Sequence, residues 1–172
     1  PRRYEEEYRT LKAVRPEISF LNANDVQLLS YFSIGSDGTL VGYASLAPEL
    51  IVGLYEAVRK GNLKEAMNIN DHMYPLTKAI YSHPRLYWHT RIKEALTMMG
   101  EIKCPASRPF LPPISKDERM NIRRVLIHCG LLKKSTHPTP RSEARGMLRV
   151  DTERRFLPRF KNRGLAPSNV SK

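Results

Sequence analysis

Most of the chain alternates apolar and polar residues with the period of an α-helix. Tyr4, Tyr8 and Leu11 are spaced to lie on one side of a helix, with charged residues between them. Ser115 and Glu118 have the spacing of a capping box, which marks where a helix begins. Comparable apolar stripes, starting residues and closing glycines predict helices over 3–14, 26–34, 48–60, 63–82, 88–100 and 115–130.

Two short stretches lack the helical period and predict β-strands. Residues 18–21 and 39–43 are rich in apolar and β-branched residues, and a helical segment separates them. Strands that are apolar on both faces are typical of parallel sheets, and strand–helix–strand is the unit from which such sheets are built. Because two strands cannot form a sheet covered on both faces, we expect further strands, either upstream of Pro1 or in another chain. The absence of an initial Met also leads us to expect that the chain is cut from a longer one.

Charge is concentrated at the end of the chain. The 172 residues carry a net charge of +12, and residues 133–172 hold 11 Lys or Arg against three Asp or Glu. This segment has too few apolar residues for a core of its own, so we predict a basic, mostly disordered tail. Nucleic-acid binding by the tail is an alternative, but Phe156 and Phe160 are too few for base stacking, so we do not favour it.

The potentially reactive side chains show no arrangement typical of a metal or cofactor site. The five histidines have neither HxH nor HExxH spacing, and no phosphate-binding glycine motif is present, so we expect no metal and no cofactor. Cys104 and Cys129 lie far apart and predict reduced thiols in an intracellular protein. Lys93 precedes Glu94 on an amphipathic helix, which predicts a solvated lysine rather than an imine-forming one. Without an apolar run of about 18 residues, we expect no membrane span and a cytoplasmic location.

Several motifs occur in an order that is more specific than any one of them alone. Asn22-Ala23-Asn24-Asp25 is followed by Gly35-x-x-Gly38 and then by Ala47-Pro48. Downstream come YWHTRIKEALTMMG at 87–100 and SRPFLPPISKDERMNIRRVLIHCGLL at 107–132. Over roughly residues 4–132 the chain resembles the C-terminal part of the dihydrodipicolinate synthase / N-acetylneuraminate lyase family.

This resemblance implies an α/β fold, namely the last two strands of a TIM barrel with appended C-terminal helices. The barrel is incomplete in this chain. The implied organisation is strand–helix units over 1–60, a helical extension over 61–132 and the basic tail over 133–172. Active sites of such barrels lie at the carboxyl ends of the strands.

The resemblance also implies a function, a Schiff-base-forming (class I) lyase or aldolase acting on pyruvate or another 2-keto acid. The imine-forming lysine would fall just upstream of Pro1 and the catalytic tyrosine earlier still, so no catalytic residue is expected here and the chain alone should be inactive. Substrate contacts are expected from Leu40, Val41, Asn22 and Asn24, although Ala23 and Val41 depart from the family pattern. Many relatives are homo-oligomers, which we therefore expect here. A non-catalytic interaction fragment or paralogue is the alternative.

Overall fold

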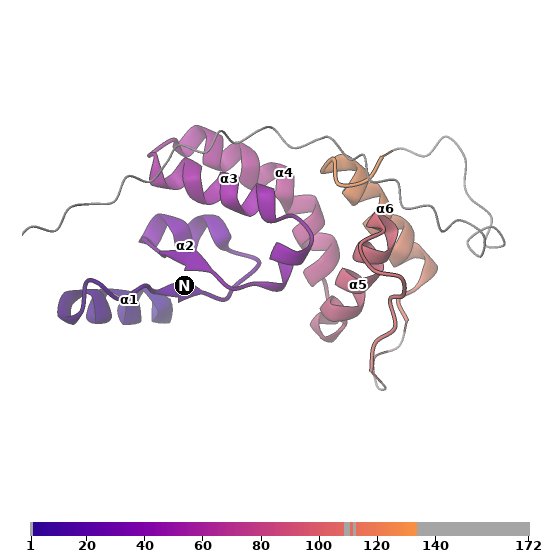
Figure 1. The fold of residues 1–172 in the computed structure, drawn as a ribbon, viewed down its shortest axis with the longest axis horizontal. Coiled ribbons are helices and arrows are strands. Elements are labelled where there is room, and N and C mark those ends of the chain that lie inside the picture. The colour runs from indigo at the N-terminus through magenta and orange to yellow at the C-terminus, as the bar shows by residue number, and fades with distance from the viewer. Residues whose placement is uncertain (1, 109–110, 112, 134–172) are drawn as a thin grey trace, which may run out of the picture. The chain divides into compact units, whose positions relative to one another are not determined.

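The computed structural model describes residues 2–108, 111 and 113–133, so almost all of the predicted basic tail lies outside the described residues. All six helices that apolar spacing predicts are present, with ends that differ by a few residues. The elements in chain order are α1 (Arg2–Val14), β1 (Leu21–Asn22), α2 (Leu28–Ile34), β2 (Gly38–Thr39), the 3-10 helix η1 (Gly42–Ser45), α3 (Pro48–Arg59), α4 (Leu63–Tyr81), the 3-10 helix η2 (Arg85–Tyr87), α5 (Trp88–Met99) and α6 (Lys116–His128) (Figure 1).

The two strands form a parallel pair, as predicted. Leu21 lies opposite Gly38 and Asn22 lies opposite Thr39, and α2 makes the connection between the strands. The predicted strand lengths were wrong, because residues 18–20 and 40–43 are not in strands and Gly42 begins η1. A strand continues only where a neighbour accepts and donates its backbone hydrogen bonds, and each strand here has one neighbour in the described chain.

Helix α1 is attached to the strand pair by an aromatic cluster and by one lysine. The Tyr4 ring lies 4.9 Å from that of Phe20 and 4.6 Å from that of Tyr31, measured between centroids. The Lys12 ammonium pairs with Asp37 at 2.8 Å and donates to the carbonyls of Pro16 and Ile18. Three acceptors use all three N–H groups of an ammonium, so Lys12 fixes α1 against the loop before β2.

The helices after β2 pack around one continuous apolar core. Tyr43 is completely buried, as expected for a packing residue, and burial raises the pKa of its hydroxyl well above the ordinary value. The core passes without a break across residue 60, where we predicted the boundary between the barrel units and the helical extension, and that division stays a prediction. Its most buried apolar members are Leu28, Phe32, Tyr43, Leu46, Ala47, Leu54, Ala66, Leu76, Ile80, Ala95, Ile122 and Leu126.

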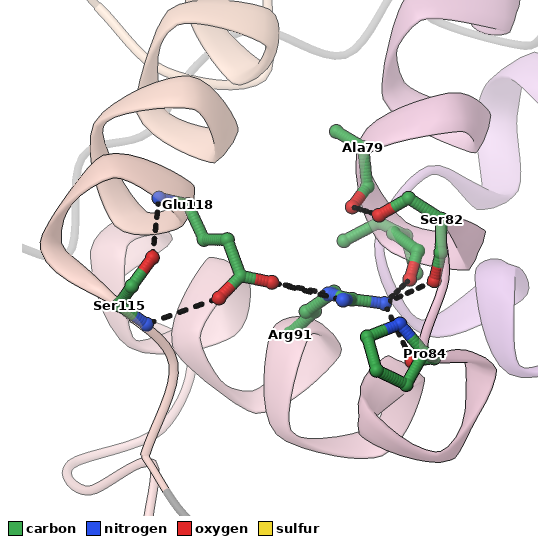
Figure 2. Close-up of polar contacts among 7 residues, drawn as sticks. Ala79, Ser82, Pro84, Arg91, Ser115 and Glu118 are labelled. Carbon is green, nitrogen blue, oxygen red and sulfur yellow. Dashed lines mark hydrogen bonds and ion pairs between the residues drawn. The ribbon is translucent and has the colours of Figure 1, made fainter.

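A buried arginine joins the end of α4 to the start of α6, a contact that no sequence pattern predicted. Arg91 is 1% exposed, and its Nη1 donates to the carbonyl oxygens of Ile80, Ser82 and Pro84 at 3.2, 2.6 and 3.2 Å. Its Nε and Nη2 donate to Oε1 of Glu118 at 3.1 and 2.8 Å. Figure 2 shows the guanidinium between these two groups of acceptors.

Glu118 has a second role in the same network. Its other carboxylate oxygen accepts from the Ser115 backbone N–H, and the Ser115 hydroxyl accepts from the Glu118 N–H, which confirms the predicted capping box. Burial alone would raise the pKa of Glu118, but the Ser115 N–H and the Arg91 guanidinium outweigh burial and lower it. One carboxylate therefore begins α6 and neutralises the buried charge of α5.

Two further contacts of α5 complete its attachment. Glu94, which is buried, pairs with Arg119 of α6. Lys93 is partly exposed, and its ammonium donates to the Ala106 carbonyl at 2.9 Å, so it also holds the loop after α5. None of the helices in the described chain is both long and apolar enough to cross a bilayer.

We predict that replacing Arg91 by Met lowers the free energy of unfolding by on the order of 3 kcal/mol, because three carbonyls and a carboxylate lose their charged donor. Urea denaturation followed by circular dichroism would measure the loss. Arg2→Met is the matched control, since Arg2 also pairs with a glutamate but its side chain is 93% exposed, and it should cost less than about 0.5 kcal/mol. Equal effects of the two substitutions would contradict the assigned role of Arg91.

A second prediction concerns Gly42, where η1 approaches α5. A methyl group added at Gly42 would lie 2.5 Å from Cζ3 of Trp88, so Gly42→Ala should lower the free energy of unfolding by about 1–3 kcal/mol. Gly53→Ala in α3 provides the opposite control, because its new methyl would lie 3.6 Å from Ile69, an ordinary contact. Alanine is the better helix former, so that variant should gain about 0.5–1 kcal/mol in the same urea experiment.

Candidate functional site at the carboxyl ends of the strands

The candidate site lies where β1 and β2 end on the same edge of the sheet. Asn22 is the last residue of β1 and Thr39 the last of β2, and the two lie opposite each other. In open parallel sheets, ligands bind beyond the carboxyl ends of the strands. The four residues that the resemblance implies as substrate contacts are Asn22, Asn24, Leu40 and Val41, and all lie at or just beyond this edge.

Asn22 is buried and its side chain is fully engaged within the protein. Its amide nitrogen donates to the Ser36 hydroxyl and to the Gly38 carbonyl, both at 3.2 Å. Its amide oxygen accepts from the Asn24 backbone N–H at 3.3 Å and from the Thr39 hydroxyl at 3.0 Å. These contacts lock the two strand ends together, so in this structure Asn22 shapes the edge of the site through its neighbours.

The turn after β1 places a carboxylate at the same edge. The Asn24 side-chain oxygen accepts from the Val26 N–H at 3.0 Å, which closes the turn. The next residue, Asp25, accepts from the Tyr43 N–H at 2.7 Å and so joins this turn to η1. Asp25 was visible in the sequence as a turn residue, but its contact with a residue 18 positions away depends on strand pairing and had no local signal.

Leu40 and Val41 differ in exposure although they are neighbours. Leu40 is 78% exposed, whereas Val41 is partly buried against the core. The backbone of Leu40 continues the strand pairing by donating to the Asn22 carbonyl at 2.9 Å. The structure thus brings the four predicted contacts together at one edge, and their contact with a substrate stays a prediction.

Tyr81, at the end of α4, brings a third segment to this edge. Its hydroxyl is buried beside the Asp25 carboxylate, without a hydrogen bond of ordinary geometry to any part of the chain that the structure describes. Burial is the main reason why the pKa of this hydroxyl is raised far above its ordinary value, and the nearby Asp25 carboxylate raises it further. The sequence placed Tyr81 in a helix but could not place it beside Asp25.

A small cavity opens between the turn after β1 and α4. Its volume is about 190 Å³. Asp25 and Gln27 contribute polar groups from one side, and Asn70 and Thr77 contribute them from α4. No group of three or more His, Cys, Asp or Glu residues that could hold a metal occurs within residues 2–108, 111 and 113–133, and the expected absence of a metal remains a prediction.

This architecture defines the class of protein: a mostly helical α/β fold with a parallel strand–helix–strand unit and a candidate site at the carboxyl ends of the strands. The model of the Dihydrodipicolinate synthetase family matches residues 3–129, and the chain belongs to this family.

Individual relatives agree with this assignment. The chain is 31% identical over 120 residues to 4-hydroxy-tetrahydrodipicolinate synthase of Rhodopseudomonas palustris, covering 70% of this chain and 39% of that protein. It is 33% identical over 126 residues to a probable 2-dehydro-3-deoxy-D-pentonate aldolase of Escherichia coli, covering 72% and 40%. A crystal structure of dihydrodipicolinate synthase from Thermotoga maritima superposes with a TM-score of 0.66 at 27% identity, covering 75% and 42%. The chain thus spans about two fifths of the length of these relatives.

We predict that Tyr81→Phe leaves the free energy of unfolding unchanged or raises it by up to about 1 kcal/mol, because it removes a buried hydroxyl without a partner. Tyr43→Phe is the matched control, since the Tyr43 hydroxyl is also buried but reaches the Met73 carbonyl at 3.5 Å, and it should cost about 0.5–1 kcal/mol. Thermal and urea denaturation at neutral pH would compare them. A larger loss from Tyr81→Phe than from Tyr43→Phe would show that Tyr81 has a partner.

Proposed function

We propose that this chain forms the C-terminal part of a Schiff-base-forming (class I) lyase or aldolase that acts on pyruvate or another 2-keto acid. The observation that carries the proposal is the parallel pairing of β1 with β2 through α2, within a chain that belongs to the Dihydrodipicolinate synthetase family. The names of the relatives, a synthase and an aldolase, fit chemistry that makes or breaks bonds next to a keto group.

In this proposal the chain supplies one wall of the active site and no catalytic group. An imine between a lysine and the keto carbon acts as an electron sink, and a nucleophilic lysine needs a desolvated or cationic environment. Lys93 does not qualify, because its ammonium is held by the Ala106 carbonyl outside the candidate site. The imine-forming lysine and the catalytic tyrosine would come from the earlier strands of a TIM barrel, so the chain alone would be inactive.

The predicted contact residues take specific roles here. Leu40 and Val41 would line the keto-acid pocket at the tip of the last strand, and Leu40 is exposed as such a role requires. Asn22 would hold the two strand tips in register, and Asn24 would shape the adjoining turn. By the same resemblance, the complete protein would be a homo-oligomer.

A specific observation favours the second candidate function, a non-catalytic fragment that binds another polypeptide. Each strand has one hydrogen-bonded neighbour in the described chain, and the apolar Leu21 and Leu40 are 51% and 78% exposed. Such an edge is a template for a further strand. Both candidate functions need that further strand, and they differ in whether the completed protein catalyses a reaction.

The experiment is borohydride trapping with pyruvate, followed by intact-mass and peptide mapping. The chain alone should gain no adduct, whereas a full-length relative should gain one. Adding the N-terminal remainder of that relative as a separate polypeptide should yield a complex with an adduct on the added polypeptide. A complex without adduct would favour the non-catalytic candidate, and an adduct on this chain alone would refute the proposed division of roles.

A further inference from the structure

A cleft of about 250 Å³ lies beside the cavity that contains Asp25, and its lining is cationic. Lys78 of α4 and His83 and Arg85 of the following segment line it together with Ser82. Val26 of the turn after β1 and Thr77 belong to both hollows, so the cleft adjoins the candidate site. The end of α4 thus brings positive side chains to the carboxyl edge of the strands.

The two permanent cations of this cleft lack counter-ions within the described residues. Neither Lys78 nor Arg85 takes part in an ion pair there, whereas Lys12, Lys60 and Arg91 each do. No acidic side chain lines the cleft, and Asp25 lines only the adjoining cavity. Cations gathered in a concave surface without carboxylates raise the local concentration of small anions.

The backbone at this point would ordinarily oppose an anion, because the carboxyl end of a helix carries partial negative charge. Here the Arg91 guanidinium compensates this partial negative charge by donating to the carbonyls of Ile80, Ser82 and Pro84 (Figure 2). Glu118 balances the formal charge of Arg91 from its other side. The partial negative charge at the end of α4 is therefore largely neutralised where Lys78 and Arg85 face solvent.

We propose that this cleft binds the anionic end group, a carboxylate or a phosphate, of a small organic acid. Lys78 and Arg85 would pair with the oxyanion. The inference rests on the proposed function in one respect: the ligand would be the end of a keto-acid substrate or product remote from the keto carbon. The neighbouring Asp25, Asn70 and Thr77 offer groups that could hydrogen-bond hydroxyls between the two ends.

The test is titration of the full ¹⁵N-labelled chain with inorganic phosphate and, separately, with succinate, at constant ionic strength. We expect saturable shifts of amide signals from residues 77–85 and from Val26. The double variant Lys78→Ala, Arg85→Ala should weaken binding at least about tenfold. The matched control is Arg123→Ala, Arg124→Ala, which removes two cations from a surface hollow of α6 and should leave the affinity unchanged. Tighter binding of phosphate would assign a phosphorylated acid, and tighter binding of succinate a dicarboxylic acid.

Shifts spread over all basic segments, or equal affinity of both double variants, would overturn the site. If the alanine variant loses its circular dichroism signal, Lys78→Gln, Arg85→Gln removes both charges but keeps more of each side chain, and it should show the same tenfold loss. Anion binding needs no catalytic lysine, so its failure is distinct from that of the proposed function. A borohydride adduct in the complete barrel without anion binding here would refute only the cleft, and anion binding without an adduct would refute only the keto-acid chemistry.

Discussion

The five hydrogen bonds that Arg91 donates are the interaction on which the helical half of the structure depends. A charge that is 1% exposed is stable only if acceptors surround it, and here the acceptors come from the end of α4 and the start of α6. The same contact holds the segment after α4, whose side chains line the cationic cleft. The packing of α4 against α6 and the placement of the residues that line the cleft are therefore coupled through one residue.

Local patterns in the sequence were sufficient for the helices and for the pairing of the strands. Helix positions follow from the spacing of residues such as Tyr4 and Tyr8, and the start of α6 follows from Ser115 and Glu118, because these signals lie within one turn. The parallel direction of β1 and β2 follows from the helix between them. Their short length did not, because it depends on which backbone groups find partners, and no pattern within 39–43 encodes that.

The candidate site was predictable only in outline. The resemblance placed Asn22, Asn24, Leu40 and Val41 at the strand ends, and the structure puts them at one edge. Asp25, Tyr81 and Arg91 were recognised only through contacts between residues far apart in the sequence, such as the hydrogen bond from the Tyr43 N–H to Asp25. An arginine at helical spacing among polar residues looks solvated in a sequence, and only the fold shows that Arg91 is enclosed.

Asn22 has a consequence for any strand that completes the sheet. Its amide bonds at once to Ser36, Gly38, Asn24 and Thr39, which fixes β1 relative to β2. A slip of one position would move Asn22 from its buried side of the sheet to the side where Leu21 is 51% exposed and would break these hydrogen bonds. A further strand that paired with β1 would therefore bind to a strand whose register with β2 is already fixed. Through Asn22, the alignment of any such added strand would depend on the side-chain amide of a single residue.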